Sequence, residues 1–252
     1  MQLIWSWLVN FIFLLNDAIY LYWLHIDDIA YLWWCDREGV IQSYGINFIQ
    51  DLPHFLVLLL CLQRFDADNW GVISAMRRPE TTPEQHSISI PLSPSVDITF
   101  NPDNKLCGHS GIVGRGTQVF LVESMSIDPR DSKKTLAKVD LVLKTYWPET
   151  SRTREDDMIR TAMKIGETNP HVAGHLPDII CSYDFVEHST GVIRKLLGIP
   201  TNGNRVLRVM LSRRLYPITE LVGEGFWNAF WECFRCKCWS NYHHLFLKFY
   251  RY

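Results

Sequence analysis

The stretch from Gly111 to Lys144 constrains the fold of this chain most, because it joins a glycine-punctuated turn to two β-prone segments. Gly114 and Gly116 lie in the turn, and the second β-prone segment, Val139–Lys144, ends in a single lysine. A backbone that approaches phosphate oxygens closely has no room for side chains, and glycine also reaches the positive φ values of a tight turn. A lysine on a neighbouring strand adds a positive charge on a stem that the sheet holds. The pattern predicts a polyphosphate cradle, with an ordinary glycine turn in a β-hairpin as the alternative.

Composition and charge indicate the size of the fold, argue against a nucleic-acid partner and suggest a cellular compartment. The chain has 252 residues, which is enough to bury a core as one large domain or two small ones. It carries 25 basic and 27 acidic side chains, and it lacks the basic face that a nucleic-acid-binding protein normally shows. Its seven cysteines form an odd, scattered set, which indicates reduced thiols and favours the cytoplasm or nucleus.

The amino-terminal residues are strongly apolar. No charged side chain occurs in Met1–Asn16, but Asp17 interrupts the run below the roughly 20 residues that a membrane-spanning helix needs. No Lys or Arg precedes Arg37, so the basic flank of a signal peptide or of a positive-inside anchor is missing. We therefore expect a hydrophobic helix or strand pair packed in a core, with a membrane anchor at Met1–Leu24 as the alternative.

A hairpin and a helix are expected next. Tyr31–Ser43 contains large apolar residues, a charged turn closed by Gly39 and a second β-prone run, which predicts a hairpin. Asp51 is the expected cap of a helix in which Phe55–Leu62 is apolar nearly all round. A helix of this kind is expected to be buried, with His54 as a surface or capping residue on its first turn.

Residues 79–104 are rich in Pro, Ser and Thr. Five prolines in this segment predict a linker or an irregular connection. Val96–Phe100 is β-prone and is expected to form a strand that leads into the glycine turn.

A helix is expected after the lysine strand. Acidic residues gather where its first turn would lie, as the helix dipole favours, and Met158, Ile159 and Ala162 form an apolar stripe at helical spacing. A solvated acidic first turn with no further role is the alternative reading of Glu155 and Asp157.

Further along, two β-prone runs and a helix are expected. Val192–Leu197 and Val206–Leu211 read as two strands joined by a glycine-containing turn. Tyr216–Leu221 then forms a bridge to a helix that begins near Gly223.

Taken together, these segments resemble the fungal-type protein kinase family. The matching stretches are Gly114-Arg115-Gly116-Thr117, Leu141-Val142-Leu143-Lys144-x-x-Trp147-Pro148, Arg152-x-x-Glu155-x-x-Met158-Ile159, His175-Leu176-Pro177 and Arg214-x-x-Pro217-Ile218-Thr219-Glu220-Leu221. The hairpin with Trp33-x-x-Asp36-Arg37-x-Gly39 also resembles a segment that precedes the kinase domain in that family. The likeness extends over residues 30–244.

The resemblance implies an α+β fold. It corresponds to the small lobe of a protein kinase, an antiparallel five-stranded sheet plus one helix, with the start of the helical large lobe and a small α+β segment in front. The implied organisation is an amino-terminal segment at 1–78, the linker at 79–104 and a kinase-like domain at 105–252.

The resemblance also implies ATP as the ligand. The glycine loop would cover the phosphates, an aliphatic side chain would cover the base, and the lysine would hold the α and β phosphates. The helix after the lysine strand would supply the partner of Lys144, with Glu155 as first choice and Asp157 as second, and residues 213–215 would line the base pocket. The residues implied to bind the nucleotide are Gly114, Arg115, Gly116, Thr117, Val119, Lys144 and Glu155.

The carboxyl end departs from the family pattern. His244 stands where the His of the catalytic His-Arg-Asp motif is expected, but Leu245 and Phe246 replace Arg and Asp, and no Asp-Phe-Gly follows. Phosphoryl transfer depends on the positioning and charge stabilisation that such residues supply. We therefore expect a truncated, inactive fragment that still carries the ATP site. No catalytic residue is assigned, and the chain is not expected to hold magnesium by itself. A non-catalytic module that binds a protein partner, as a pseudokinase does, is the alternative.

A cysteine-rich stretch near the carboxyl end offers a competing metal site. Cys233, Cys236 and Cys238, followed by His243 and His244, have residue types that bind zinc. The preceding residues, however, read as one continuous helix. We therefore expect buried helical cysteines and no metal.

Overall fold

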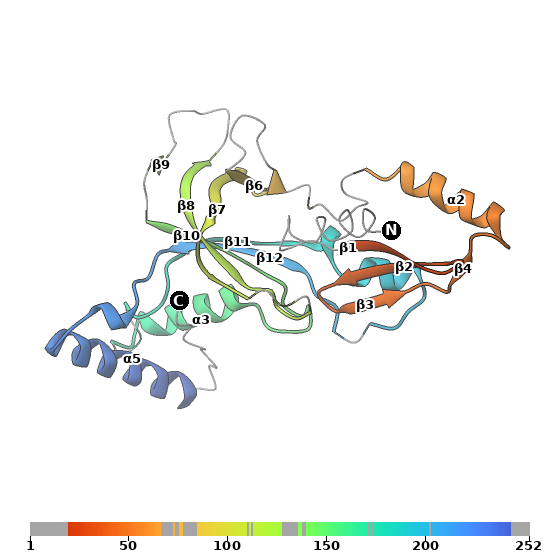
Figure 1. Cartoon of the computed structure of the whole chain (residues 1–252). Coiled ribbons are helices and arrows are strands. Elements are labelled where there is room, and N and C mark those ends of the chain that lie inside the picture. Colours follow the sequence, from red (N-terminus) through yellow and green to blue (C-terminus); the bar gives the residue numbers. More distant parts are fainter. Residues whose placement is uncertain are drawn as a thin grey trace.

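The computed structural model describes residues 20–66, 73, 76–77, 85–109, 111, 113–127, 136–137, 140–170, 172, 174–201 and 203–242. This part of the chain is a mixed α+β fold with two antiparallel sheets (Figure 1). A four-stranded sheet lies toward the amino terminus, and an eight-stranded sheet forms the body of the protein.

The smaller sheet is built from consecutive strands in the order β1-β2-β3, with β4 paired to β2. Asp36 pairs with Gly39 where β2 turns into β3, so the predicted hairpin is confirmed. The bounds are β1 (Tyr20–Ile26), β2 (Ile29–Asp36), β3 (Gly39–Gln42) and β4 (Ile46–Asn47).

The proposed amino-terminal anchor, Met1–Leu24, lies mostly outside the described residues. Its last part belongs to β1, which pairs with β2 along its whole length. No helix in the described part of the chain is long and apolar enough to span a membrane.

Helix α2 (Leu52–Gln63) forms where the sequence predicts a helix, but it is not buried. None of its residues is buried, and Leu56 and Val57 are more than half exposed. Phe55 of the helix lies against Phe48, and their ring centroids are 5.4 Å apart. The prediction of burial was wrong because the strand that the helix contacts most, β4, has only two residues and is too short to cover an apolar surface that extends round the helix. His54 is 80% exposed beside Asp51, as expected for a surface residue.

The larger sheet has the order β11-β12-β10-β8-β7-β6-β5, with β9 paired to β8. Eight strands therefore form it in the described residues, where five were expected. The bounds are β5 (Met76–Arg77), β6 (His86–Ile90), β7 (Val96–Gly108), β8 (Gln118–Ile127), β9 (Leu136–Ala137), β10 (Leu141–Tyr146), β11 (Ile179–Phe185) and β12 (Leu207–Arg213).

Two predictions of secondary structure were wrong. Part of the expected linker at 79–104 forms β6, because Ile88 and Ile90 alternate with polar residues and bury one face of the strand. The strand expected at Val96–Phe100 is confirmed as the first part of β7. The expected strand at Val192–Leu197 is instead helix α4 (Gly191–Leu196). A short apolar run fits either structure, and β11 takes the place in the sheet beside β12. The strand at Val206–Leu211 is confirmed as β12 within one or two residues.

The core lies on one face of the larger sheet, and the second face carries the lysine. Successive side chains of a strand point to opposite faces, so Leu141 and Leu143 join the buried apolar cluster while Lys144 points the other way. Helix α3 (Glu155–Gly166), which forms where a helix was predicted, covers this second face (Figure 1). All of β10 is thereby buried.

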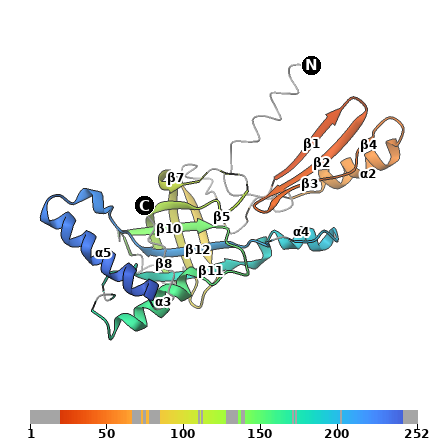
Figure 2. The ribbon, with the colours of Figure 1, turned by 90° about the horizontal axis from the view of Figure 1, so that it is seen from below.

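Two helices extend from the body of the protein. Seen from below, α4 reaches from the larger sheet toward the smaller one (Figure 2). Helix α5 (Glu224–Tyr242) follows β12 after a short 3-10 turn and begins one residue after Gly223, as predicted.

Candidate nucleotide site

Lys144 and Glu155 form a buried ion pair between β10 and α3. The ammonium nitrogen lies 2.8 Å from both carboxylate oxygens. The lysine side chain is 3% exposed and the glutamate 14%. Burial lowers the pKa of Lys144, and the carboxylate of Glu155 opposes this effect by favouring the charged form. The predicted pairing of these two residues is therefore present.

The second choice of partner is placed differently. Asp157 is 60% exposed and lies 3.9 Å from Arg154, the residue that precedes α3. The acidic first turn of α3 therefore contains one carboxylate that faces the sheet toward Lys144 and another that faces solvent.

The first turn of α3 is fixed to the sheet by charged side chains. Arg154 donates two hydrogen bonds of 3.1 Å to Asp156 and lies 3.3 Å from Asp184 of β11. Asp184 also accepts hydrogen bonds from the guanidinium of Arg208 in β12, the longer of them 2.8 Å. This network holds the helix over the face of the sheet that carries Lys144, so the orientation of Glu155 depends on it.

The glycine loop lies beside this ion pair. It connects β7 to β8 and is closed by a hydrogen bond of 3.0 Å from the amide of His109 to the carbonyl of Thr117. Gly114 and Gly116 have φ angles of 105° and 48°, which side-chain-bearing residues rarely adopt. The carbonyl of Arg115 accepts a 2.7 Å hydrogen bond from the amide of Trp147, three residues after Lys144. This hydrogen bond holds the glycine loop against the end of the strand that carries Lys144.

Val119 and the segment at residues 213–215, which was expected to line the base pocket, also lie next to β10. Val119 is buried in β8 and pairs directly with Lys144 of β10. After β12, the amide of Arg214 donates to the carbonyl of Asp140 at 2.8 Å. The structure therefore brings the loop, Val119, Lys144 and Glu155 together, and their role in binding a nucleotide stays a prediction.

Comparison with known sequences decides the family. The sequence profile described as fungal protein kinase matches residues 24–207. The chain belongs to the fungal protein kinase family. The match spans the β2–β3 hairpin, the glycine loop and the Lys144–Glu155 pair. No curated protein and no solved structure matches the chain.

The cysteines considered as a zinc site lie in helix α5. Helix α5 runs without a break through Cys233 and Cys236, of which the first is exposed and the second buried. No cluster of side chains able to hold a metal ion occurs among the described residues. His243 and His244 lie outside them.

Helix α5 instead presents aromatic side chains to solvent. Phe230 stacks on Phe234 with ring centroids 6.4 Å apart, and Trp227 and Trp231 are each more than half exposed. The interaction-module interpretation, with a protein as partner, stays a prediction.

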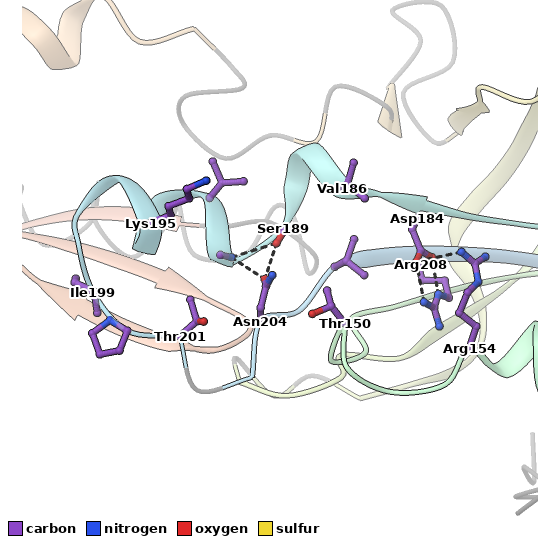
Figure 3. A pocket seen from close by; sticks show the side chains of 14 residues that line it. Thr150, Arg154, Asp184, Val186, Ser189, Lys195, Ile199, Thr201, Asn204 and Arg208 are labelled. Atoms are coloured by element: carbon purple, nitrogen blue, oxygen red, sulfur yellow. Dashed lines mark hydrogen bonds and ion pairs between the residues drawn. The ribbon is translucent and has the colours of Figure 1, made fainter.

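A cleft of about 860 Å³ lies away from the lysine, between α4, the segment that precedes β12 and the ends of β11 and β12 (Figure 3). Several of its polar groups engage one another. The side-chain oxygen of Asn204 accepts from the amide of Gly191 at 2.8 Å and from the hydroxyl of Ser189, while Asp184 and Arg208 pair at its other end. Neither the glycine loop nor Lys144 lines this cleft.

Sequence reasoning did not anticipate the contacts of the β2–β3 turn. Asp36 forms a buried ion pair with Arg194 of α4, and Arg37 contacts the glycine loop. The Trp33-x-x-Asp36-Arg37 pattern marked the turn as a family feature, but nothing in its spacing indicated what it contacts.

Proposed function

We propose that this chain binds ATP in a protein-kinase-type site, in which Lys144 contacts the phosphates and Glu155 holds the lysine in position. The observation that carries the proposal is the buried ion pair between the two residues, with the glycine loop beside it. The family membership of the chain supports the same function.

The energetics of the pair favour a functional explanation. Burying two charges costs desolvation energy that their attraction often does not recover, so apolar residues of similar size stabilise a core as well or better. A buried lysine whose pKa is lowered by desolvation is a typical feature of functional sites. Phosphate oxygens beside Lys144 would favour its charged form and offset part of the desolvation cost.

The neighbouring residues have defined parts in the proposal. The loop at Gly114–Thr117 would approach the phosphates with its main chain, since Gly114 leaves the space beside its backbone open. Val119 would contact the base. Phosphoryl transfer also requires an aspartate beside the acceptor hydroxyl and ligands for magnesium, and the proposal assigns neither to the described residues, among which no metal-binding cluster occurs.

The test is ligand binding by the purified chain. ATP at a concentration one hundred times its Kd should increase the free energy of unfolding of the wild type by roughly 2.7 kcal/mol. In a chain of this length the Tm should then rise by several degrees. Lys144→Met should abolish this rise, because it removes the phosphate-binding charge but keeps the apolar stem. Lys164→Ala, which changes an exposed lysine in the last turn of α3, is the matched control and should respond as the wild type does.

Isothermal titration measures the same binding directly, with and without magnesium. A wild type that shows neither heat of binding nor a rise in Tm would overturn the proposal. Equal binding by Lys144→Met would remove the role of Lys144.

A further inference from the structure

The turn between β2 and β3 packs against the glycine loop. The carbonyl of Arg37 accepts a 2.9 Å hydrogen bond from the amide of Gly114, and the Arg37 guanidinium donates to the carbonyl of Gly111. Arg37 is almost fully buried. These contacts are made to the main chain of the loop, so they fix its backbone rather than its side chains.

Gly116 shows how closely the two segments fit. A Cβ atom at this position would lie 2.4 Å from the guanidinium carbon of Arg37 and 2.5 Å from one of its nitrogens. The guanidinium therefore occupies the space that any side chain at residue 116 would need. Glycine is favoured here by the contact with Arg37 as well as by its positive φ.

The turn is itself held rigidly. One carboxylate oxygen of Asp36 accepts the amides of Glu38 and Gly39 at 2.8 and 3.1 Å, and the other pairs with the guanidinium of Arg194 in α4. Glu38 accepts a 2.8 Å hydrogen bond from the hydroxyl of Thr190, just before α4. The turn thus has an anchor at α4 to which the loop itself contributes no side chain.

The loop and this anchor are also joined through Trp147, the residue that follows β10. The amide of Trp147 donates to Arg115 in the loop, and its carbonyl accepts a 3.0 Å hydrogen bond from the guanidinium of Arg205. The amide of Arg205 in turn donates to the hydroxyl of Thr190 at 2.9 Å. A closed ring of contacts therefore runs from the hairpin turn through the loop and the lysine strand and back to the turn.

We propose that the turn Asp36–Gly39 is a built-in clamp for the glycine loop, and that Arg37 is the positioning residue that presents the loop to the phosphates of the ligand. A loop held in one conformation before binding loses less conformational entropy when the ligand arrives, and so binds more tightly. The inference rests on the proposed function, because the ligand it concerns is the nucleotide.

The first experiment compares phosphate-bearing and phosphate-free ligands. Arg37→Ala should weaken ATP and ADP about tenfold and leave adenosine within about twofold, because the loop contacts phosphates and not the nucleoside. Arg152→Ala is the matched control, since this arginine is half exposed and pairs with Glu149 at the surface. Equal losses for ATP and adenosine, tighter ATP binding, or no change in ATP affinity would each overturn the clamp.

Hydrogen–deuterium exchange without nucleotide separates the clamp from the proposed function. Peptides that cover residues 109–118 should exchange faster in Arg37→Ala, while peptides from α3 keep the wild-type rate. Unchanged exchange in the loop overturns the clamp even if the wild type binds ATP. Failure of the wild type to bind ATP, together with faster loop exchange, overturns the proposed function instead.

A double-variant cycle tests the contact itself. Gly116→Ala should lower the Tm more in the wild type than in Arg37→Ala, because the added methyl group collides with the guanidinium only when Arg37 is present. Gly114→Ala is the control, since a Cβ there meets no atom within 4 Å and its backbone strain is the same in both backgrounds. Equal Tm losses for Gly116→Ala in the two backgrounds would show that the two residues are not in contact.

Discussion

Two buried ion pairs occupy different positions in this protein and behave differently. The Lys144–Glu155 pair joins β10 of the larger sheet to helix α3, and the Glu155 side chain is 14% exposed. The Asp36–Arg194 pair joins the smaller sheet to α4, and its side chains are 0% and 6% exposed. In the proposed site the partly accessible pair shares its cation with a ligand, whereas the enclosed pair holds the hairpin turn against α4.

The largest effect is expected where the enclosed pair is broken. Asp36→Ala leaves the Arg194 charge buried without its main partner, and it also removes the acceptor that closes the turn. We expect the free energy of unfolding to fall by about 3–5 kcal/mol, as measured by urea denaturation. Asp28→Ala, in an exposed turn of the same sheet, should change it by less than about 0.5 kcal/mol.

Replacing both charges sharpens this test. Asp36→Leu combined with Arg194→Met should recover a large part of the loss, because two apolar side chains incur no desolvation cost. A single Asp36→Ala variant that loses less than about 1 kcal/mol, the value of a surface pair, would show that the enclosed pair does not hold the hairpin turn to α4.

A smaller effect is expected at the nucleotide site. Glu155→Ala leaves the Lys144 ammonium buried with its partner removed, but the exposed edge of the site allows water to approach. We expect a loss of about 2–3 kcal/mol, below the range for a fully buried pair. Asp157→Ala is the matched control on the same helical turn and should cost less than about 0.5 kcal/mol. Similar losses in the two variants would contradict the assignment of Glu155 as the lysine partner.

The smallest effect concerns pH. Folding lowers the pKa of Lys144 because burial disfavours the ammonium, so the unfolded chain holds this proton more tightly. Burial of the charged lysine therefore lowers the free energy of unfolding. This loss is fully present at pH values below the pKa of Lys144 in the folded chain, and it disappears as the pH rises toward the ordinary value of 10.5. The free energy of unfolding of the wild type should therefore increase relative to Lys144→Met as the pH rises toward 10.5. Chemical denaturation across this range measures the difference, and a decrease would reverse the assigned direction.

Much of the site follows from local sequence. Lys144 and Glu155 are 11 residues apart in consecutive elements, so the β-prone run and the acidic helical turn were recognisable locally, and the family resemblance supplied their pairing. Gly114 and Gly116 were likewise recognisable, because few other residues adopt their φ angles. The hairpin at β2–β3, helix α3 and the start of α5 were predicted for the same reason, namely that their signals lie within one element.

The remainder depends on contacts between distant segments. Asp36 and Arg194 are 158 residues apart, and no periodicity or spacing connects them. The exposure of α2 and the helical state of Gly191–Leu196 were missed because both are set by what surrounds the segment. In each case the residue pattern allowed two outcomes, and tertiary packing chose between them.

The enclosed pair between Asp36 and Arg194 has a consequence for the ancestry of this protein. A buried arginine without its aspartate is strongly unfavourable, so neither the hairpin nor α4 is easily lost or exchanged alone during evolution. The two segments should be inherited as a unit, although they lie at opposite ends of the family match. Among related sequences, an acidic residue in the hairpin turn should accompany an arginine in the helix before β12, and the two should be replaced together.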